Sequence, residues 1–159
     1  RCSSTMSRFR TRLVAVLAAV ALAVTAPPPS PAAAAGGPNL ALGRAATASS
    51  VNGPYAAGNL TDGNAGSYWE SAGSTFPQWA QVDLGSAQSV DQVVLKLPTG
   101  WETRTETLSV QGSTDGGTFT TLAASAGRTF SPANGNTVTL SFPATSARHV
   151  RITVTANTG

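Results

Sequence analysis

Cysteine and histidine are nearly absent from the sequence, with Cys2 and His149 as the only representatives. A single cysteine cannot form a disulfide within the chain, and no cysteine–histidine cluster is available to bind zinc. A lone histidine is seldom a catalytic base, and the sequence has neither a Gly-x-Ser-x-Gly elbow nor a phosphate-binding glycine loop. The fold must therefore be held together by an apolar core or by a bound metal.

Clustered positive charge is also lacking beyond the N-terminal region. The whole chain carries a formal charge of +3, but from residue 36 onward six basic residues stand against seven acidic ones, a net charge of −1. Proteins that bind nucleic acid neutralise phosphates with groups of lysine and arginine. We therefore expect no nucleic-acid partner.

The N-terminal region has the pattern of a secretory signal. A basic stretch (7–12) precedes an unbroken apolar run (13–26), and prolines and small residues follow. This order predicts a signal peptide over residues 1–35, with Met6 as the natural start. The apolar run is shorter than the ~20 residues that a membrane span needs. We therefore expect a secreted mature domain over residues 36–159.

The mature part shows a β pattern throughout. Its short apolar runs are separated by turn residues, and residues 138–142 and 150–154 alternate between apolar and polar. Such alternation is typical of strands with one wet face. Asp-Gly at 115–116 and Asn-Gly at 134–135 have the composition of hairpin turns. An all-β sandwich or barrel is therefore predicted, with strands at 80–84, 92–97, 107–113, 119–123, 136–142 and 148–155.

Five segments carry a family likeness through their order: NLALGRAATASS (39–50), NLTDGNAGSYWES (59–71), FPQWAQVDLG (76–85), SVQGSTDGGTF (109–119) and ARHVRITVTANTG (147–159). Together they resemble the coagulation factor 5/8 type C, or discoidin, domain. The likeness is to the branch of bacterial carbohydrate-binding modules attached to secreted glycoside hydrolases. This resemblance implies the galactose-binding-like fold, an antiparallel jelly-roll β-sandwich of about eight strands, with ligand loops at one end and a structural calcium ion.

The resemblance covers about residues 38–159 and departs from the family pattern at its end. In the family, the strand that matches 149–159 is followed by another strand, usually preceded by an acidic residue. We therefore expect a sandwich with its C-terminal strand missing, in a fragment of a longer secreted protein. The catalytic domain would lie in the part that is not present.

The loop at 59–67 is the candidate metal site. Calcium is bound by six to eight oxygens, and the resemblance implies that Asn59, Asp62, Asn64 and Ser67 supply some of them. The alternative is that Asp62 and Asn64 only form an Asx-type turn. Because the acidic ligand of the terminal strand is absent, calcium binding is expected to be weakened.

The three tryptophans are expected to play different roles. Trp79 enters a strand and is interpreted as a core anchor. Trp69 ends the metal loop and is expected to be half-buried against it. Trp101 lies in a polar connection, where an aromatic ring either stacks on a sugar or folds back on the rim of the sandwich.

Polar groups near Trp101 are the candidate sugar ligands. Sugar hydroxyls are bound by planar partners that offer several donors or acceptors, such as arginine and glutamate. The resemblance places the loop after the metal site and the loop around Trp101 at the sugar site. The predicted site is therefore Trp101, Arg104, Glu70, Glu102 and Tyr68, with Tyr55 as a further contact.

These observations favour a non-catalytic carbohydrate-binding module that holds a polysaccharide or oligosaccharide near an appended glycoside hydrolase. The module is expected to be a monomer tethered to that enzyme. One alternative is a discoidin-type adhesion module for a membrane surface or a protein, against which the charge of −1 argues. A second is a small glycosidase that uses Glu70 and Glu102 as its carboxylate pair.

Overall fold

The computed structural model describes residues 37–159, so the predicted signal peptide and Met6 lie outside the described residues. In this part no helix is long and apolar enough to span a membrane. The elements, in chain order, are β1 (Ala46–Ala48), the 3-10 helix η1 (Ala57–Leu60), β2 (Gln78–Lys96), β3 (Arg104–Ser113), β4 (Thr120–Phe130), the 3-10 helix η2 (Pro132–Asn134) and β5 (Thr137–Asn157).

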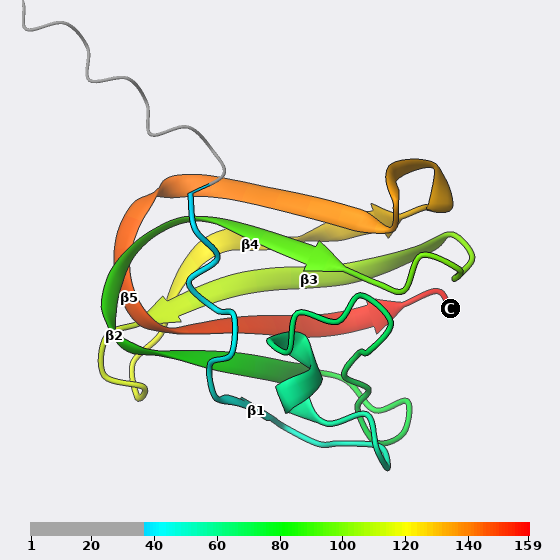
Figure 1. The fold of residues 1–159 in the computed structure, drawn as a ribbon, viewed down its shortest axis with the longest axis horizontal. Helices are drawn as coiled ribbons and strands as arrows, with labels where there is room; N and C mark the ends of the chain where they lie inside the picture. Colours follow the sequence, from blue (N-terminus) through cyan, green and yellow to red (C-terminus); the bar gives the residue numbers. More distant parts are fainter. Residues whose placement is uncertain (1–36) are drawn as a thin grey trace, which may run out of the picture. The chain divides into compact units, whose positions relative to one another are not determined.

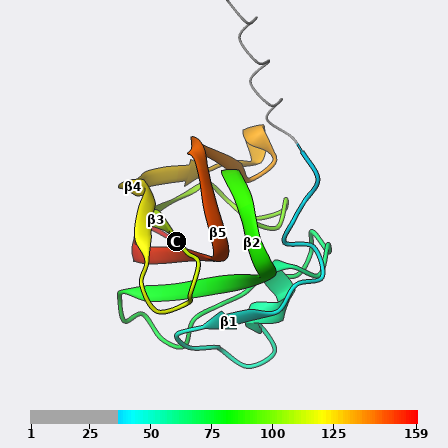
Figure 2. The ribbon, with the colours of Figure 1, turned by 90° about the vertical axis from the view of Figure 1, so that its left-hand side faces the viewer.

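The strands form one antiparallel sheet in the order β1-β2-β5-β3-β4. β2 and β5 are long and pair along most of their length, with register shifts between Asp83 and Gln88 and between Val90 and Gln92. Figure 2 shows both strands turning sharply, so each contributes to two layers. The all-β antiparallel sandwich is confirmed. Residues 37–159 contain fewer strands than the family pattern implies, because β2 and β5 each replace two short strands.

The core lies between the two layers and is built by the alternation seen in the sequence. One cluster is centred on Leu108, Val110, Phe130 and Leu140, and the apolar positions of 138–142 and 150–154 pack against it. A second cluster contains Leu84, Val90 and Ala147. The period-two pattern therefore places the apolar side chains correctly.

Trp79 is not part of this core, which corrects the prediction that it is a core anchor. Its neighbours Gln78 and Ala80 are the buried residues, at 9% and 3% exposure. Because side chains alternate along a strand, the indole of Trp79 lies on the outer face of the sheet. There it packs against the guanidinium of Arg151, 4.4 Å from the ring centroid.

Both predicted turns are present. The Asp-Gly turn at 115–116 joins β3 to β4, and the Asp115 carboxylate accepts hydrogen bonds from the N–H groups of Gly117 and Thr118. The Asn-Gly pair at 134–135 ends η2, whose first turn is capped by the Ser131 side chain. These two turns lie at opposite ends of the sandwich, and the end with η2 also holds the loop between β2 and β3 (Figure 1).

Candidate functional site

Aromatic rings from three loop segments meet at the η2 end of the sandwich. Tyr55 and Tyr68 stack with ring centroids 4.5 Å apart and an angle of 16° between their planes. Tyr68 meets Trp101 edge-on, also at 4.5 Å, with an angle of 71°. The guanidinium of Arg104 lies 4.6 Å from the Trp101 ring centroid. These four residues form one half-buried group, called here the aromatic cluster.

Hydrogen bonds to main-chain carbonyls hold the loops that carry the aromatic cluster. The Trp101 N–H donates to the Pro98 carbonyl at 3.1 Å, which closes a tight turn before β3. The side-chain amide of Asn59 donates to the Tyr68 carbonyl at 3.0 Å. Arg104 begins β3, so strand pairing holds its backbone in place. The cluster is therefore assembled without a ligand.

Arg104 is the member of the cluster with unused hydrogen-bonding capacity. Within residues 37–159 its side chain has no hydrogen bond or ion pair, and its Nε is buried without a partner. A guanidinium carries five N–H donors in a plane. Trp101 covers one face of that plane, and Gly159 packs against its Cζ, Nε and Nη1 atoms. The terminal N–H groups are donors of the kind that bind sugar hydroxyls or a carboxylate.

Tyr68 remains a neutral phenol over the physiological pH range. Hydrogen bonding with the Tyr55 hydroxyl, together with desolvation and the nearby charges of Tyr55 and Glu70, raises the pKa of Tyr68 to about 12. A neutral phenol both donates and accepts hydrogen bonds. The Glu70 N–H donates to the Tyr55 carbonyl at 3.1 Å, so Glu70 lies beside the cluster.

The two candidate carboxylates differ in their surroundings. Glu70 is exposed and accepts a hydrogen bond from the Asn52 amide at 2.8 Å. Glu102 is exposed, and in the described part of the chain its side chain has no recorded partner. The structure thus brings Tyr68, Trp101 and Arg104 into contact, while the two glutamates lie outside that contact. A glycosidase acid needs a desolvated carboxyl, and neither glutamate is shielded from water.

Oxygen atoms converge on the Ser67 hydroxyl in the predicted metal loop. This hydroxyl lies 2.6 Å from Asp62 Oδ2, 3.0 Å from the Asn64 carbonyl oxygen and 3.4 Å from the Asn59 carbonyl oxygen. The Ser67 hydroxyl and the Asn64 N–H lower the pKa of Asp62, so its carboxyl is ionised at neutral pH. The Asx-type turn that was the alternative is also present, because the Asn64 N–H donates to Asp62 Oδ1 at 2.8 Å.

This set of oxygens is of the kind that calcium binds, but it contains one carboxylate. Within residues 37–159 no group of three or more His, Cys, Asp or Glu side chains is placed to hold a metal. The main-chain oxygens of Asn59 and Asn64, rather than their amides, face the Ser67 hydroxyl. These oxygens are of the type that a hard cation binds, and such a cation would need further oxygens to complete its coordination.

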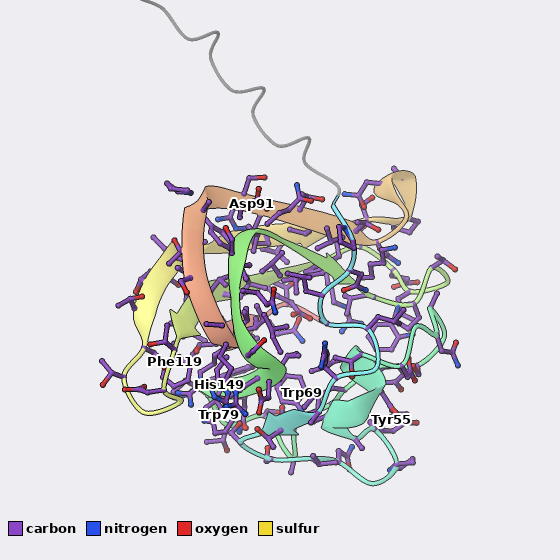
Figure 3. All side chains as sticks on the ribbon, turned by 60° about the vertical axis from the view of Figure 1, so that its left-hand side comes forward. Tyr55, Trp69, Trp79, Asp91, Phe119 and His149 are labelled. Atoms are coloured by element: carbon purple, nitrogen blue, oxygen red, sulfur yellow. The ribbon has the colours of Figure 1, made fainter. Side chains whose placement is uncertain are left out.

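The other two tryptophans take no part in the ring contacts of the aromatic cluster. Trp69 is half-buried, as predicted, and its indole N–H donates to the Ser50 carbonyl at 2.9 Å. On the outer face of the sheet, Arg151 lies between Trp79 and Phe119, 3.9 Å from the Phe119 centroid. Figure 3 shows Trp79 and Phe119 grouped together beside His149, far from Tyr55. No sequence motif predicted this second stacked arginine.

The described part of the chain is thus a small β-sandwich that carries an aromatic cluster on its end loops. The chain belongs to the NedA-like, galactose-binding domain family of F5/F8 type C domains, whose model matches residues 59–152, more than half of the sequence. No curated protein matches the chain.

Solved structures of carbohydrate-binding modules resemble it along most of their length. A variant of chitosan-binding module 1 from a Paenibacillus sp. IK-5 chitosanase/glucanase is 34% identical, with 76% of this chain and 88% of that chain covered and a TM-score of 0.61. Chitosan-binding module 2 of that enzyme, solved with chitotriose, is 32% identical, with 76% and 90% covered and a TM-score of 0.60. The family 32 module of AlyQ, solved with 4,5-unsaturated mannuronic acid, is 31% identical, with 72% and 84% covered and a TM-score of 0.59.

Proposed function

We propose that this chain is a secreted carbohydrate-binding module that binds a glycan at the aromatic cluster. The observation that carries the proposal is the Arg104 guanidinium, which is stacked on Trp101 and has no recorded partner within residues 37–159. Rings supply apolar area for the sugar face, and the terminal N–H groups of the guanidinium supply directed donors. Tyr55, Tyr68 and the exposed carboxylates of Glu70 and Glu102 line the same region.

The module is proposed to act beside an enzyme. The chitosan-binding modules it resembles derive from a chitosanase/glucanase, and the AlyQ module accompanies an alginate lyase domain. A single site on a repeating glycan binds weakly, but tethering raises the effective concentration of an attached enzyme at the polymer. The signal pattern over residues 1–35 supports export of such a protein.

A calcium ion is proposed as a structural cofactor at the 59–67 loop. Its ligands would be the carbonyl oxygens of Asn59 and Asn64, the Asp62 carboxylate and the Ser67 hydroxyl, which already converge. The bound ion would neutralise Asp62 and fix the loop. Tyr68 directly follows this loop, so the cation would also steady one ring of the aromatic cluster.

The ligand can carry charge of either sign. A uronic acid carboxylate would pair with Arg104, whereas a protonated amino sugar would be drawn to Glu70 and Glu102. The test panel therefore includes soluble chitosan, alginate and pectin beside a neutral glucan and a neutral galactan. Affinity electrophoresis of the full chain through gels that contain each polymer identifies the ligand class.

The chain offers a matched pair of substitutions for this experiment. Arg104→Lys and Arg151→Lys each replace an arginine stacked on a tryptophan, at 4.6 and 4.4 Å respectively. Retardation by at least one polymer should weaken in Arg104→Lys and persist in Arg151→Lys, because lysine cannot reproduce the planar donors. Equal weakening in both variants, or no retardation of folded protein by any polymer, would refute the proposal. In the latter case binding to lipid vesicles would test the adhesion alternative.

A further inference from the structure

Asn136 is a fully buried polar residue, with 0% exposure, between η2 and β5. Its backbone has the left-handed value φ = 51°. Its N–H donates to the Ser131 carbonyl at 2.8 Å, and its carbonyl accepts from the Leu97 N–H at 3.0 Å. Its side-chain amide donates to the carbonyls of Pro98 and Trp101, at 2.8 and 3.0 Å.

These bonds join two loops that the sequence separates widely. The amide of Asn136 contacts the first and last carbonyls of the turn that the Trp101 N–H closes on Pro98. The second of these carbonyls belongs to the residue that carries the indole ring. Arg104 begins β3 three residues later and is held by strand pairing. The Asn136 side chain therefore fixes the turn that sets where the indole lies against the strand-held guanidinium.

We propose that Asn136 is the positioning residue of the glycan site, which sets the Trp101 turn so that ring and guanidinium are stacked before the ligand arrives. This inference rests on the proposed function. Asn136 is too deeply buried to touch a glycan, and it acts through Trp101 and Arg104. A site that is ordered in advance loses less conformational freedom on binding, which raises its affinity.

The backbone conformation of Asn136 provides a selective variant. Glycine adopts a left-handed φ without strain, so Asn136→Gly keeps the two main-chain hydrogen bonds and removes only the side-chain amide. Asn134→Ala is the matched control. The Asn134 side chain accepts from the N–H groups of Ser131 and Thr137, at 3.2 and 3.3 Å, and so stabilises the same loop. It has no recorded bond to the Trp101 turn.

The first readout is independent of any ligand. With 5-fluorotryptophan incorporated in the full chain, the three tryptophans give three fluorine resonances, and the spectrum of Trp101→Phe assigns one of them. In Asn136→Gly the Trp101 resonance should shift and broaden, while those of Trp69 and Trp79 stay in place and report an intact fold. In Asn134→Ala all three should stay. An unchanged Trp101 resonance in Asn136→Gly, or an equal change in Asn134→Ala, would overturn the proposal.

The second readout is affinity for the panel polysaccharide that retards the wild type most. Asn136→Gly should bind at least about fivefold more weakly, equivalent to about 1 kcal/mol, and Asn134→Ala less than about twofold. An unchanged affinity in Asn136→Gly would overturn the positioning role. If Trp101→Ala also bound normally, the proposed site itself would be wrong, so the two failures are distinguishable.

Should Asn136→Gly fail to fold, the wild-type protein supplies a third readout. The side-chain amide protons of Asn136 should exchange slowly with solvent, and saturation with the polysaccharide should slow them further because a bound ligand stabilises the ordered turn. Rapid exchange, or exchange that the ligand leaves unchanged, would contradict the proposal.

Discussion

The guanidinium of Arg104 lies 4.6 Å from the centroid of the Trp101 ring, and only residues 102–103 separate the two in the chain. Neither residue needs a ligand to reach this position, because β3 fixes Arg104 and the Asn136 amide holds the Trp101 turn. The stacked pair therefore exists as a preformed surface with unpaired donors. Under the proposed function, this arrangement is what allows a chain with few charges and one histidine to bind a polar polymer.

Calcium should stabilise the protein through the 59–67 loop. At ten times its Kd, a ligand that binds only the folded state adds about 1.4 kcal/mol, which raises Tm by about 4–8 °C for a domain of this size. Asp62→Asn removes the one carboxylate at the converging oxygens and should abolish the rise. Thermal unfolding in millimolar calcium, compared with chelator, measures it.

Asp115→Asn is the control for the calcium experiment. Asp115 also accepts main-chain hydrogen bonds in a tight turn, but at the opposite end of the sandwich. This variant should keep the calcium-dependent rise in Tm. A wild-type Tm that does not respond to calcium would show that the loop is only an Asx-type turn.

The core cluster makes a prediction about stability. Leu108 is 1% exposed and packs with Phe130 and Leu140, so Leu108→Ala should lower the free energy of unfolding by about 2–5 kcal/mol. Val94 lies on a strand but is 46% exposed, and Val94→Ala should cost below about 1 kcal/mol. Urea unfolding, analysed with the same m-value for both variants, compares their free energies of unfolding. Similar losses in both variants would mean that the core is assigned to the wrong face.

The ion pair between Asp83 and Arg148 is expected to cause part of the loss of folding stability at low pH. Two hydrogen bonds from Arg148, at 2.9 and 3.0 Å, and one from the Gly85 N–H hold the pKa of Asp83 well below its ordinary value of 3.8. A carboxyl with a lowered folded-state pKa stabilises the fold above its unfolded pKa. That stability is lost as the pH falls through the folded value.

Asp83→Asn should therefore lose less stability than the wild type between about pH 5 and pH 2. Burial raises the pKa of Glu106, so the effect of Glu106 on the pH dependence of stability has the opposite sign. Glu106 is present in both proteins, so its effect cancels in the comparison. Urea midpoints measured across this pH range test the difference. Parallel pH profiles for the two proteins would show that the ion pair adds nothing to acid stability.

The fold class and most strand faces were predictable from the sequence. Alternation in 138–142 and 150–154 correctly assigned the residues that pack against Leu108 and Leu140. The same rule, applied to Trp79, would have placed it on the outer face with Gln81 and opposite buried Ala80. Its place at the start of a strand suggested a core role instead, but the alternation of side chains along the strand decides the face on which a residue lies.

The site was predictable only in its composition. Tyr68, Trp101 and Arg104 were proposed together from their loops, and their contacts are seen in the structure. The role of Asn136 was not visible, because it depends on hydrogen bonds across 35 and 38 positions of sequence. The Asn-rich turn before β5 was a clue, because a position with left-handed backbone conformation favours asparagine or glycine. What that residue would hold in place was set by the tertiary structure.

The most direct test of the account compares Trp101→Ala with Trp79→Ala by affinity electrophoresis in the polysaccharide that retards the wild type most. Each variant removes an indole that stacks on an arginine, and thermal unfolding confirms that each is folded. Trp101→Ala should lower affinity at least about tenfold, equivalent to about 1.4 kcal/mol, while Trp79→Ala should bind as the wild type does. Normal binding by Trp101→Ala, with loss in Trp79→Ala, would move the glycan site to the outer face of the sheet and contradict the account.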